Sequence, residues 1–132
     1  MAARVLIVDD DREMVELIQL FLVNAGYETL TATSGEAALE TAFREKPDLI
    51  LLDIMMPKID GWEVFRSIKN DPQTKAIPIA FITARTQNID KMIGLSVMKA
   101  DGYITKPFSK KDLLEKVGQI LRSRESAGDQ ES

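Results

Sequence analysis

The sequence contains neither cysteine nor histidine among its 132 residues. The absence of cysteine excludes disulfide bonds, thiolate nucleophiles and cysteine zinc sites. The absence of histidine excludes Ser-His-Asp catalysis and metal sites built from imidazole nitrogens. Any chemistry that this chain performs must therefore use carboxylates, hydroxyls, lysine and a hard metal ion.

Long apolar runs and an excess of positive charge are also missing. No apolar stretch approaches the roughly 20 residues that a membrane-spanning helix needs, and the N-terminus shows no signal-peptide pattern. A net charge of −4 argues against non-specific binding to nucleic acids or to a membrane surface. With 45% hydrophobic and 29% charged residues, we expect a soluble, cytoplasmic globular protein that binds neither nucleic acid nor membrane.

Five short apolar or β-branched segments alternate with five segments that carry apolar residues at helical spacing. We expect strands over residues 4–8, 27–32, 49–52, 77–82 and 102–105. We expect helices over residues 12–25, 35–45, 62–70 and 89–98, and a last helix from a Ser109 cap to about Leu121. This alternation predicts an α/β protein with a doubly wound sheet of five parallel strands and helices on both faces. We expect the sheet to be flavodoxin-like, with the strand order 2-1-3-4-5.

The length of the chain suggests one domain with one complete core. We expect this domain to occupy residues 1–121. Residues 122–132 are polar and include several small residues, so we expect them to form a disordered tail.

The most informative stretch is Leu49–Pro57, in which four large aliphatic residues lead directly into Asp53. A short continuous apolar run is typical of a strand that is buried on both faces of a parallel sheet. Asp53 would then lie at the carboxyl edge of the sheet, where open α/β sheets bind their ligands. Taken alone, Asp53 is equally well explained as an ordinary turn residue.

Other strand ends carry complementary groups, namely Asp9 and Asp10 after the first strand, Thr83 after the fourth and Lys106 after the fifth. Each has an ordinary explanation by itself, as a helix cap, a strand-end hydroxyl or a solvated lysine. Because the first and third strands are neighbours in this sheet, the three carboxylates converge and need a cation. Oxygen ligands alone favour Mg²⁺, and with Mg²⁺ and Lys106 the site is neutral. Such a site has the parts for phosphoryl transfer to Asp53.

Four stretches of the chain resemble the response-regulator receiver domains of two-component signalling, and the stand-alone chemotaxis regulator in particular. The stretches are residues 5–10, residues 51–57 with Asp60 and Gly61, residues 82–84 and residues 103–108. The resemblance covers residues 4 to about 121, and the motifs together are highly specific.

The resemblance implies that Asp53 accepts a phosphoryl group and that Asp10, Asp53 and the Met55 carbonyl ligate Mg²⁺. It implies that Asp9 acts mainly through metal-bound water and that Lys106 holds a phosphoryl oxygen. Because the chain has no histidine, the donor is expected to be another protein or a small phosphodonor. The resemblance implies that the protein donor is a histidine kinase or a histidine phosphotransfer protein.

Further implied roles concern the response to phosphorylation. Thr83 would bind a phosphoryl oxygen, Tyr103 would be the aromatic switch residue, and Pro107 would follow a cis peptide bond. The surface of the fourth helix, fifth strand and fifth helix would bind an unidentified downstream effector protein. The segment 96–101 lacks the glycine usual in the family and looks one residue longer, which puts the shape of that surface and the reach of Tyr103 in doubt.

Three alternatives remain. An aspartate-nucleophile phosphatase of the haloacid dehalogenase type would need an acid at position 55, where this chain has Met55. A flavin carrier would need a phosphate-binding loop where this chain has Asp9, Asp10 and Asp11. A pseudo-receiver would lack part of the acidic and lysine set. We expect a signalling module that catalyses only its own phosphorylation and dephosphorylation, and so not an enzyme in the usual sense.

Overall fold

The computed structural model describes residues 2–54, 56, 61–84 and 100–131. Its elements are β1 (Arg4–Val8), α1 (Arg12–Asn24), β2 (Glu28–Ala32), α2 (Gly35–Glu45), β3 (Leu49–Asp53), α3 (Gly61–Lys69), β4 (Ile79–Ala84), β5 (Gly102–Lys106) and α5 (Lys110–Glu131). The helix expected over residues 89–98 lies outside the described residues. Within the described part of the chain, no helix is both long and apolar enough to cross a bilayer.

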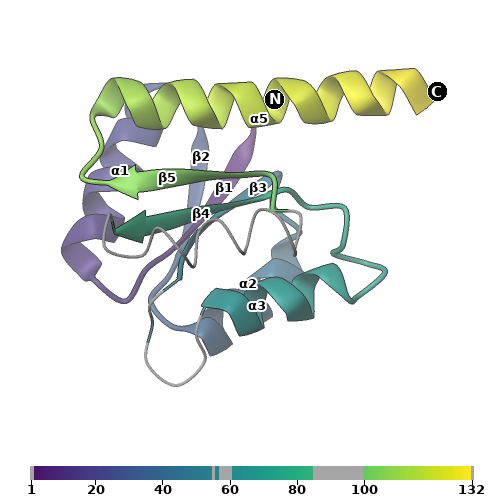
Figure 1. The fold of residues 1–132 in the computed structure, drawn as a ribbon, viewed down its shortest axis with the longest axis horizontal. Helices are drawn as coiled ribbons and strands as arrows, with labels where there is room; N and C mark the ends of the chain where they lie inside the picture. Colours follow the sequence, from purple (N-terminus) through teal and green to yellow (C-terminus); the bar gives the residue numbers. More distant parts are fainter. Residues whose placement is uncertain (1, 55, 57–60, 85–99, 132) are drawn as a thin grey trace.

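The five strands form one sheet in the order β2-β1-β3-β4-β5, and every neighbouring pair is parallel (Figure 1). The flavodoxin-like topology predicted from the alternation of strands and helices is therefore confirmed. Parallel neighbours require crossover connections, which α1, α2 and α3 supply between the first four strands. Because β1 and β3 are adjacent, chain segments more than 40 residues apart end side by side at the same edge, with Val8 opposite Leu52.

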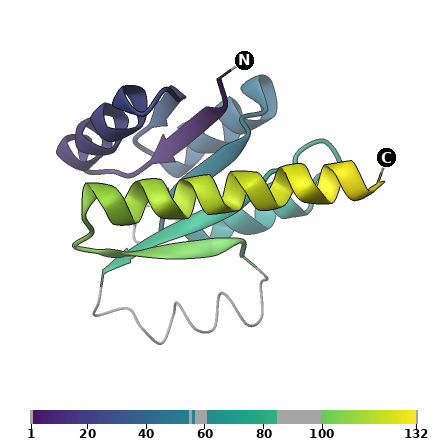
Figure 2. The ribbon, with the colours of Figure 1, turned by 90° about the horizontal axis from the view of Figure 1, so that it is seen from above.

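The sheet is buried on both faces, as the continuous apolar runs indicated. Helices cover both faces of the sheet (Figures 1 and 2). Alternate residues of β1 and β3 belong to two separate cores. Leu6, Val8, Ile50 and Leu52 lie in the core with α2 and α3. Val5, Ile7, Leu49 and Leu51 lie in the core with α1 and α5. Packing on both faces holds β1 and β3 in place and so fixes the positions of their carboxyl ends.

Polar side chains begin the helices. Asp11 accepts hydrogen bonds from two backbone N–H groups at the start of α1, and the Ser34 hydroxyl accepts one at the start of α2. Ser109 and Asp112 bond reciprocally to each other's backbone N–H at the start of α5. After α1, Gly26 adopts φ +97°, a left-handed conformation that costs glycine little and ends the helix.

Strand β4 begins at Ile79, two residues later than we expected. The N–H of Ile77 donates to the Thr74 carbonyl within the preceding turn, so it is not available to a neighbouring strand. Pro78 has no N–H, although its carbonyl still accepts from Ile50 of β3. The apolar pattern alone did not distinguish these residues from the strand itself.

The largest difference from expectation concerns the end of the chain. Helix α5 does not end near Leu121 but continues to Glu131, so that its last turns extend beyond the strands (Figures 1 and 2). The expectation of a disordered segment after Leu121 is therefore corrected. No proline interrupts this segment, and Arg124 ties it to the domain. The Arg124 guanidinium donates to the carbonyl and carboxylate oxygens of Asp48, at 2.9 and 3.0 Å. The limit of the receiver domain at residue 121 stays a prediction.

We expect Arg124→Ala to lower the free energy of unfolding by about 0.5–1 kcal/mol, because a partly exposed ion pair is worth about that much. Arg122→Ala is the matched control, since its guanidinium lies over Gly118 of the same helix, and it should change stability by less than about 0.5 kcal/mol. Urea unfolding of the two variants measures the difference. Equal losses would show that the Asp48 contact does not hold the helix.

Candidate acidic site at the carboxyl edge of the sheet

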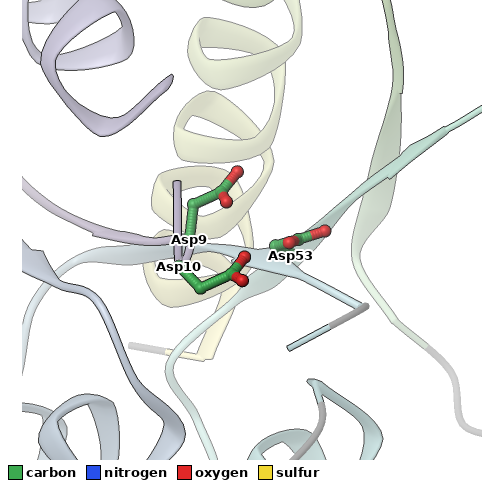
Figure 3. Close-up of side chains that lie close together, drawn as sticks. All are labelled: Asp9, Asp10 and Asp53. Atoms are coloured by element: carbon green, nitrogen blue, oxygen red, sulfur yellow. The ribbon is translucent and has the colours of Figure 1, made fainter. Parts of the chain in front are cut away.

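Three carboxylates meet where β1 and β3 end. Asp9 and Asp10 follow β1 directly, and Asp53 is the last residue of β3 (Figure 3). One carboxylate oxygen from each residue lies within 4.8 Å of the others. Asp9 is 1% exposed and Asp53 is 6% exposed, whereas Asp10 is open to solvent. The strand-end residues predicted from the sequence therefore do come together.

The donor set suits a small hard cation. Opposite ligands of an octahedral magnesium ion are about 4 Å apart, so oxygens within 4.8 Å need only a small closure to reach it. The three groups offer oxygen only, which favours Mg²⁺ over softer metals. Met55, whose carbonyl the resemblance assigned to the metal, lies outside the described residues.

Lys106 brings positive charge to the cluster from β5. Its ammonium lies 3.0 Å from Oδ2 of Asp9 and 4.0 Å from Oδ1 of Asp53. The lysine thus borders the site on the side of β5. Its side chain is 24% exposed, so part of it remains accessible to solvent. With this lysine, the three carboxylates carry a net charge of about −2, which one divalent cation would neutralise. The peptide bond from Lys106 to Pro107 is cis, as the resemblance implied.

Asp9 is held by two hydrogen bonds. Its Oδ2 accepts from the Lys106 ammonium, and its Oδ1 accepts from the backbone N–H of Asp11 at 2.9 Å. A carboxylate buried to this degree is stable as an anion only when such partners replace water. The sequence analysis gave Asp11 no role, although an aspartate two residues after another aspartate and just before a helix is a recognisable turn and cap signal.

Thr83 lies at the end of β4 and is fully buried. Within the described residues, its hydroxyl oxygen has no hydrogen-bond partner. A buried polar group in that state costs free energy, so the hydroxyl is available to a group that enters the site. Asp53 pairs with Ile82 in the β3–β4 ladder, which places Thr83 one residue beyond the partner of Asp53.

Tyr103 shares a sheet face with Thr83. It pairs with Phe81 across β4 and β5, while Thr83 pairs with Thr105, so Tyr103 and Thr83 are diagonal neighbours. The tyrosine is partly buried against the core that contains α2 and α3. The two predicted switch residues therefore lie on the same face of the sheet, on neighbouring strands.

Three aromatic side chains that were not predicted from the sequence pack together on one face of β4. The Trp62 ring is 4.7 Å from the Phe81 ring, measured between centroids, and the Phe65 ring is 5.3 Å from it. Phe81 precedes Thr83 by two residues on the same face. Trp62 is the only tryptophan of the chain, so its fluorescence reports on this region alone.

Gly61 begins α3 directly against the end of β3. Its N–H donates to the Ile54 carbonyl at 2.9 Å. A Cβ at this position would strike the backbone oxygen of Asp53 and lie 2.7 Å from Cα of Ile54. Only a residue without a side chain lets the helix come this close, and the contact fixes the backbone that carries Asp53.

The comparisons with known proteins agree with this geometry. Residues 5–118 match the family described as response regulator receiver domain. The chain is 44% identical over 127 residues to the alkaline phosphatase synthesis transcriptional regulatory protein PhoP of Bacillus subtilis (strain 168), covering 96% of this chain and 52% of that protein. The chain thus spans about half the length of this relative.

Solved structures give the same result. The chemotaxis protein CheY4 of Vibrio cholerae is 33% identical, with a TM-score of 0.83 and coverage of 91% of this chain and 99% of that one. A CheY-like receiver domain protein from Methanospirillum hungatei JF-1 is 28% identical, with a TM-score of 0.88 and coverage of 96% and 99%. The chain therefore belongs to the response-regulator receiver domains, the signal-receiving modules of two-component systems.

Gly61→Ala should destabilise the protein by about 1–3 kcal/mol, because the new methyl group meets backbone that cannot move without shifting β3. Gly102→Ala is the control, since its Cβ would meet side-chain atoms of Ile120 and Lys116, the nearest being the terminal Cδ1 of Ile120 at 3.2 Å, which a side-chain rotation relieves. Urea unfolding should place the Gly61 variant clearly below the Gly102 variant. Equal midpoints would contradict the proposed close contact with β3.

Proposed function

We propose that this domain receives a phosphoryl group on Asp53 and changes its binding surface in response. The observation that carries the proposal is the convergence of Asp9, Asp10, Asp53 and Lys106 from three strands at one sheet edge. A carboxylate oxygen of Asp53 would attack the phosphorus of a phosphohistidine, forming the O–P bond while the N–P bond breaks. The imidazole leaves on the donor, a histidine kinase or a histidine phosphotransfer protein.

Asp10 and Asp53 are the residues that would hold Mg²⁺. The two hydrogen bonds that Asp9 already accepts fit a role through metal-bound water. Bound Mg²⁺ would supply electrostatic stabilisation to the oxygens of the transferring phosphoryl group. The Lys106 ammonium, 4.0 Å from Asp53, needs only a short movement to reach the same oxygens.

The response would begin at Thr83. Phosphorylation replaces the single negative charge of Asp53 by about two. The unpartnered Thr83 hydroxyl would donate to a phosphoryl oxygen, and its movement would open space for Tyr103 on the same sheet face. A full reversal from 1:99 to 99:1 requires about 5.5 kcal/mol, and one or two charge-assisted bonds supply about 1.5–3 kcal/mol each. We therefore expect a strong but incomplete shift toward the state that binds an effector protein.

The domain would act in the cytoplasm and would catalyse only its own phosphorylation and dephosphorylation. Neither nucleic acid nor a membrane is proposed as a partner of this domain, in keeping with its net charge of −4. The pseudo-receiver alternative is disfavoured because the acidic residues and the lysine are all in place. The phosphatase alternative is disfavoured by Met55 at the position where that class carries its second acid.

Incubation with acetyl phosphate and Mg²⁺ should add one phosphoryl group, detected by intact-protein mass spectrometry and removed by hydroxylamine. Asp53→Asn should abolish the addition, because an amide oxygen is a far weaker nucleophile than a carboxylate. Removal of Mg²⁺ with EDTA should suppress it in the parent protein.

Asp71→Asn is the matched control, since Asp71 lies in the turn after α3, well away from the acidic site. It should be phosphorylated like the parent protein. If Asp53→Asn were still modified at the parent rate, the assignment of the acceptor would be wrong.

Thr83→Ala should retain phosphorylation of Asp53 but lose most of the conformational response, because the hydroxyl that binds the phosphoryl oxygen is gone. NMR signals of the Tyr103 ring, with and without beryllium fluoride, measure the response. Thr83→Ser restores a hydroxyl and should restore the shift, whereas Thr41→Ala, which removes a buried hydroxyl on α2, should leave it unchanged. A parental response in Thr83→Ala would exclude coupling through this residue.

A further inference from the structure

We propose that Asp11 is a positioning residue that orients the Lys106 ammonium through the Asp9 carboxylate. The inference rests on the proposed function, because its consequence is a faster phosphoryl transfer to Asp53. Asp11 is the third member of the acidic run after β1, and neither metal binding nor phosphoryl transfer has so far given it a role.

The first step is the cap of α1. One carboxylate oxygen of Asp11 accepts hydrogen bonds from the backbone N–H groups of Glu13 and Met14, at 3.0 and 3.4 Å. The Asp11 carbonyl accepts from Val15 and so begins the helical pattern. These bonds fix the Asp11 backbone to the rigid end of a helix whose inner face is anchored in the core by Val15, Ile18 and Leu22.

The second step joins this backbone to Asp9. The Asp11 N–H points back and donates to Oδ1 of Asp9 at 2.9 Å. Once Oδ1 is held, the plane of the carboxylate is fixed, and Oδ2 is the oxygen that meets the Lys106 ammonium at 3.0 Å. Asp9 is 1% exposed, so bulk solvent competes little with these two donors.

The third step is the effect on the lysine. The Lys106 side chain is 24% exposed and long, so it can adopt many orientations unless a partner restrains it. Asp9 supplies the restraint and keeps the ammonium 4.0 Å from Asp53, close to where phosphoryl oxygens would develop charge. Loss of the cap would let the Asp11 backbone and the Asp9 carboxylate rotate, and the ammonium would leave this position.

Two substitutions separate the cap from the charge of Asp11. Asp11→Ala removes the cap, while Asp11→Asn keeps an equally good capping oxygen and removes only the charge. Ser34→Ala is the matched control, because it removes a cap of the same kind from α2, whose hydroxyl accepts from the Ala37 N–H at 3.1 Å. Asp11→Ala and Ser34→Ala should both lower the melting temperature, by about 3–5 °C.

The first readout needs neither metal nor phosphodonor. The Nζ ammonium NMR signal of Lys106 is identified by its loss in Lys106→Arg. In Asp11→Ala it should shift toward the signals of solvated lysines, and in Asp11→Asn and Ser34→Ala it should stay at the parent position. A purely structural role of the cap would move the melting temperature and leave this signal in place.

The second readout is the rate of phosphorylation by acetyl phosphate at saturating Mg²⁺. Asp11→Ala should slow it by about 10-fold, the lower end of the loss seen when a supporting residue behind a functional group is removed. Asp11→Asn should restore the rate, and Ser34→Ala should leave it unchanged.

Two outcomes would overturn the inference: an unmoved Lys106 signal in Asp11→Ala, or an equal loss of rate in Asp11→Asn. A parent protein that takes up no phosphoryl group would instead refute the proposed function, and the NMR readout would still decide the positioning role of Asp11.

Discussion

The three carboxylates of the site repel one another, and the fold must hold them together against this repulsion. Two unit charges 4.8 Å apart repel by about 3 kcal/mol at an effective dielectric constant of 20. The chain keeps the groups together because β1 and β3 are buried on both faces and cannot move apart without opening two hydrophobic cores. Burial of each aliphatic side chain in these strands stabilises the fold by about 1.5–3 kcal/mol. The summed burial of the two strands therefore exceeds the repulsion among the carboxylates.

Lys106 relieves part of this repulsion and links the site to β5. Its bond to Asp9 joins two residues that lie 97 positions apart in the chain. The charge that remains suits one divalent cation, and the buried hydroxyl of Thr83 suits one further anionic oxygen. Mg²⁺ and a phosphoryl group, the ligands of the proposed function, would match these two features.

The first residues of α1 and α3 hold the backbone and side chains of the acidic site in place. Asp11 at the start of α1 holds Asp9, and Gly61 at the start of α3 contacts the backbone of Asp53. The Asp11 N–H donates to the Asp9 carboxylate, and the Gly61 N–H donates to the Ile54 carbonyl next to Asp53. Both donors are backbone groups fixed by secondary structure, so these bonds cost no side-chain entropy. At the opposite edge of the sheet, Asp48 precedes β3 and accepts from the backbone of Arg4 and from the Arg124 side chain.

The sequence by itself determined the parallel α/β architecture and the members of the acidic cluster, and the strand order followed from the flavodoxin-like fold type. Apolar runs and alternation are local signals, and parallel strands must place their carboxyl ends at one edge, so Asp9, Asp10, Asp53 and Lys106 were predictable without coordinates. Boundaries were less certain, because the turn bond of Ile77 leaves no trace in the apolar pattern.

Only the tertiary structure decided which atoms meet. The hydrogen bond from Asp11 to Asp9 and the contact of Gly61 with Asp53 depend on distances of a few ångströms between packed elements. The same holds for the buried Thr83 hydroxyl, which has no partner among the residues that the structure describes. The continuation of α5 to Glu131 is accompanied by the contact of Arg124 with Asp48, 76 residues away. Local composition favoured disorder there, and no pattern within a short window of sequence encodes a partner at that separation.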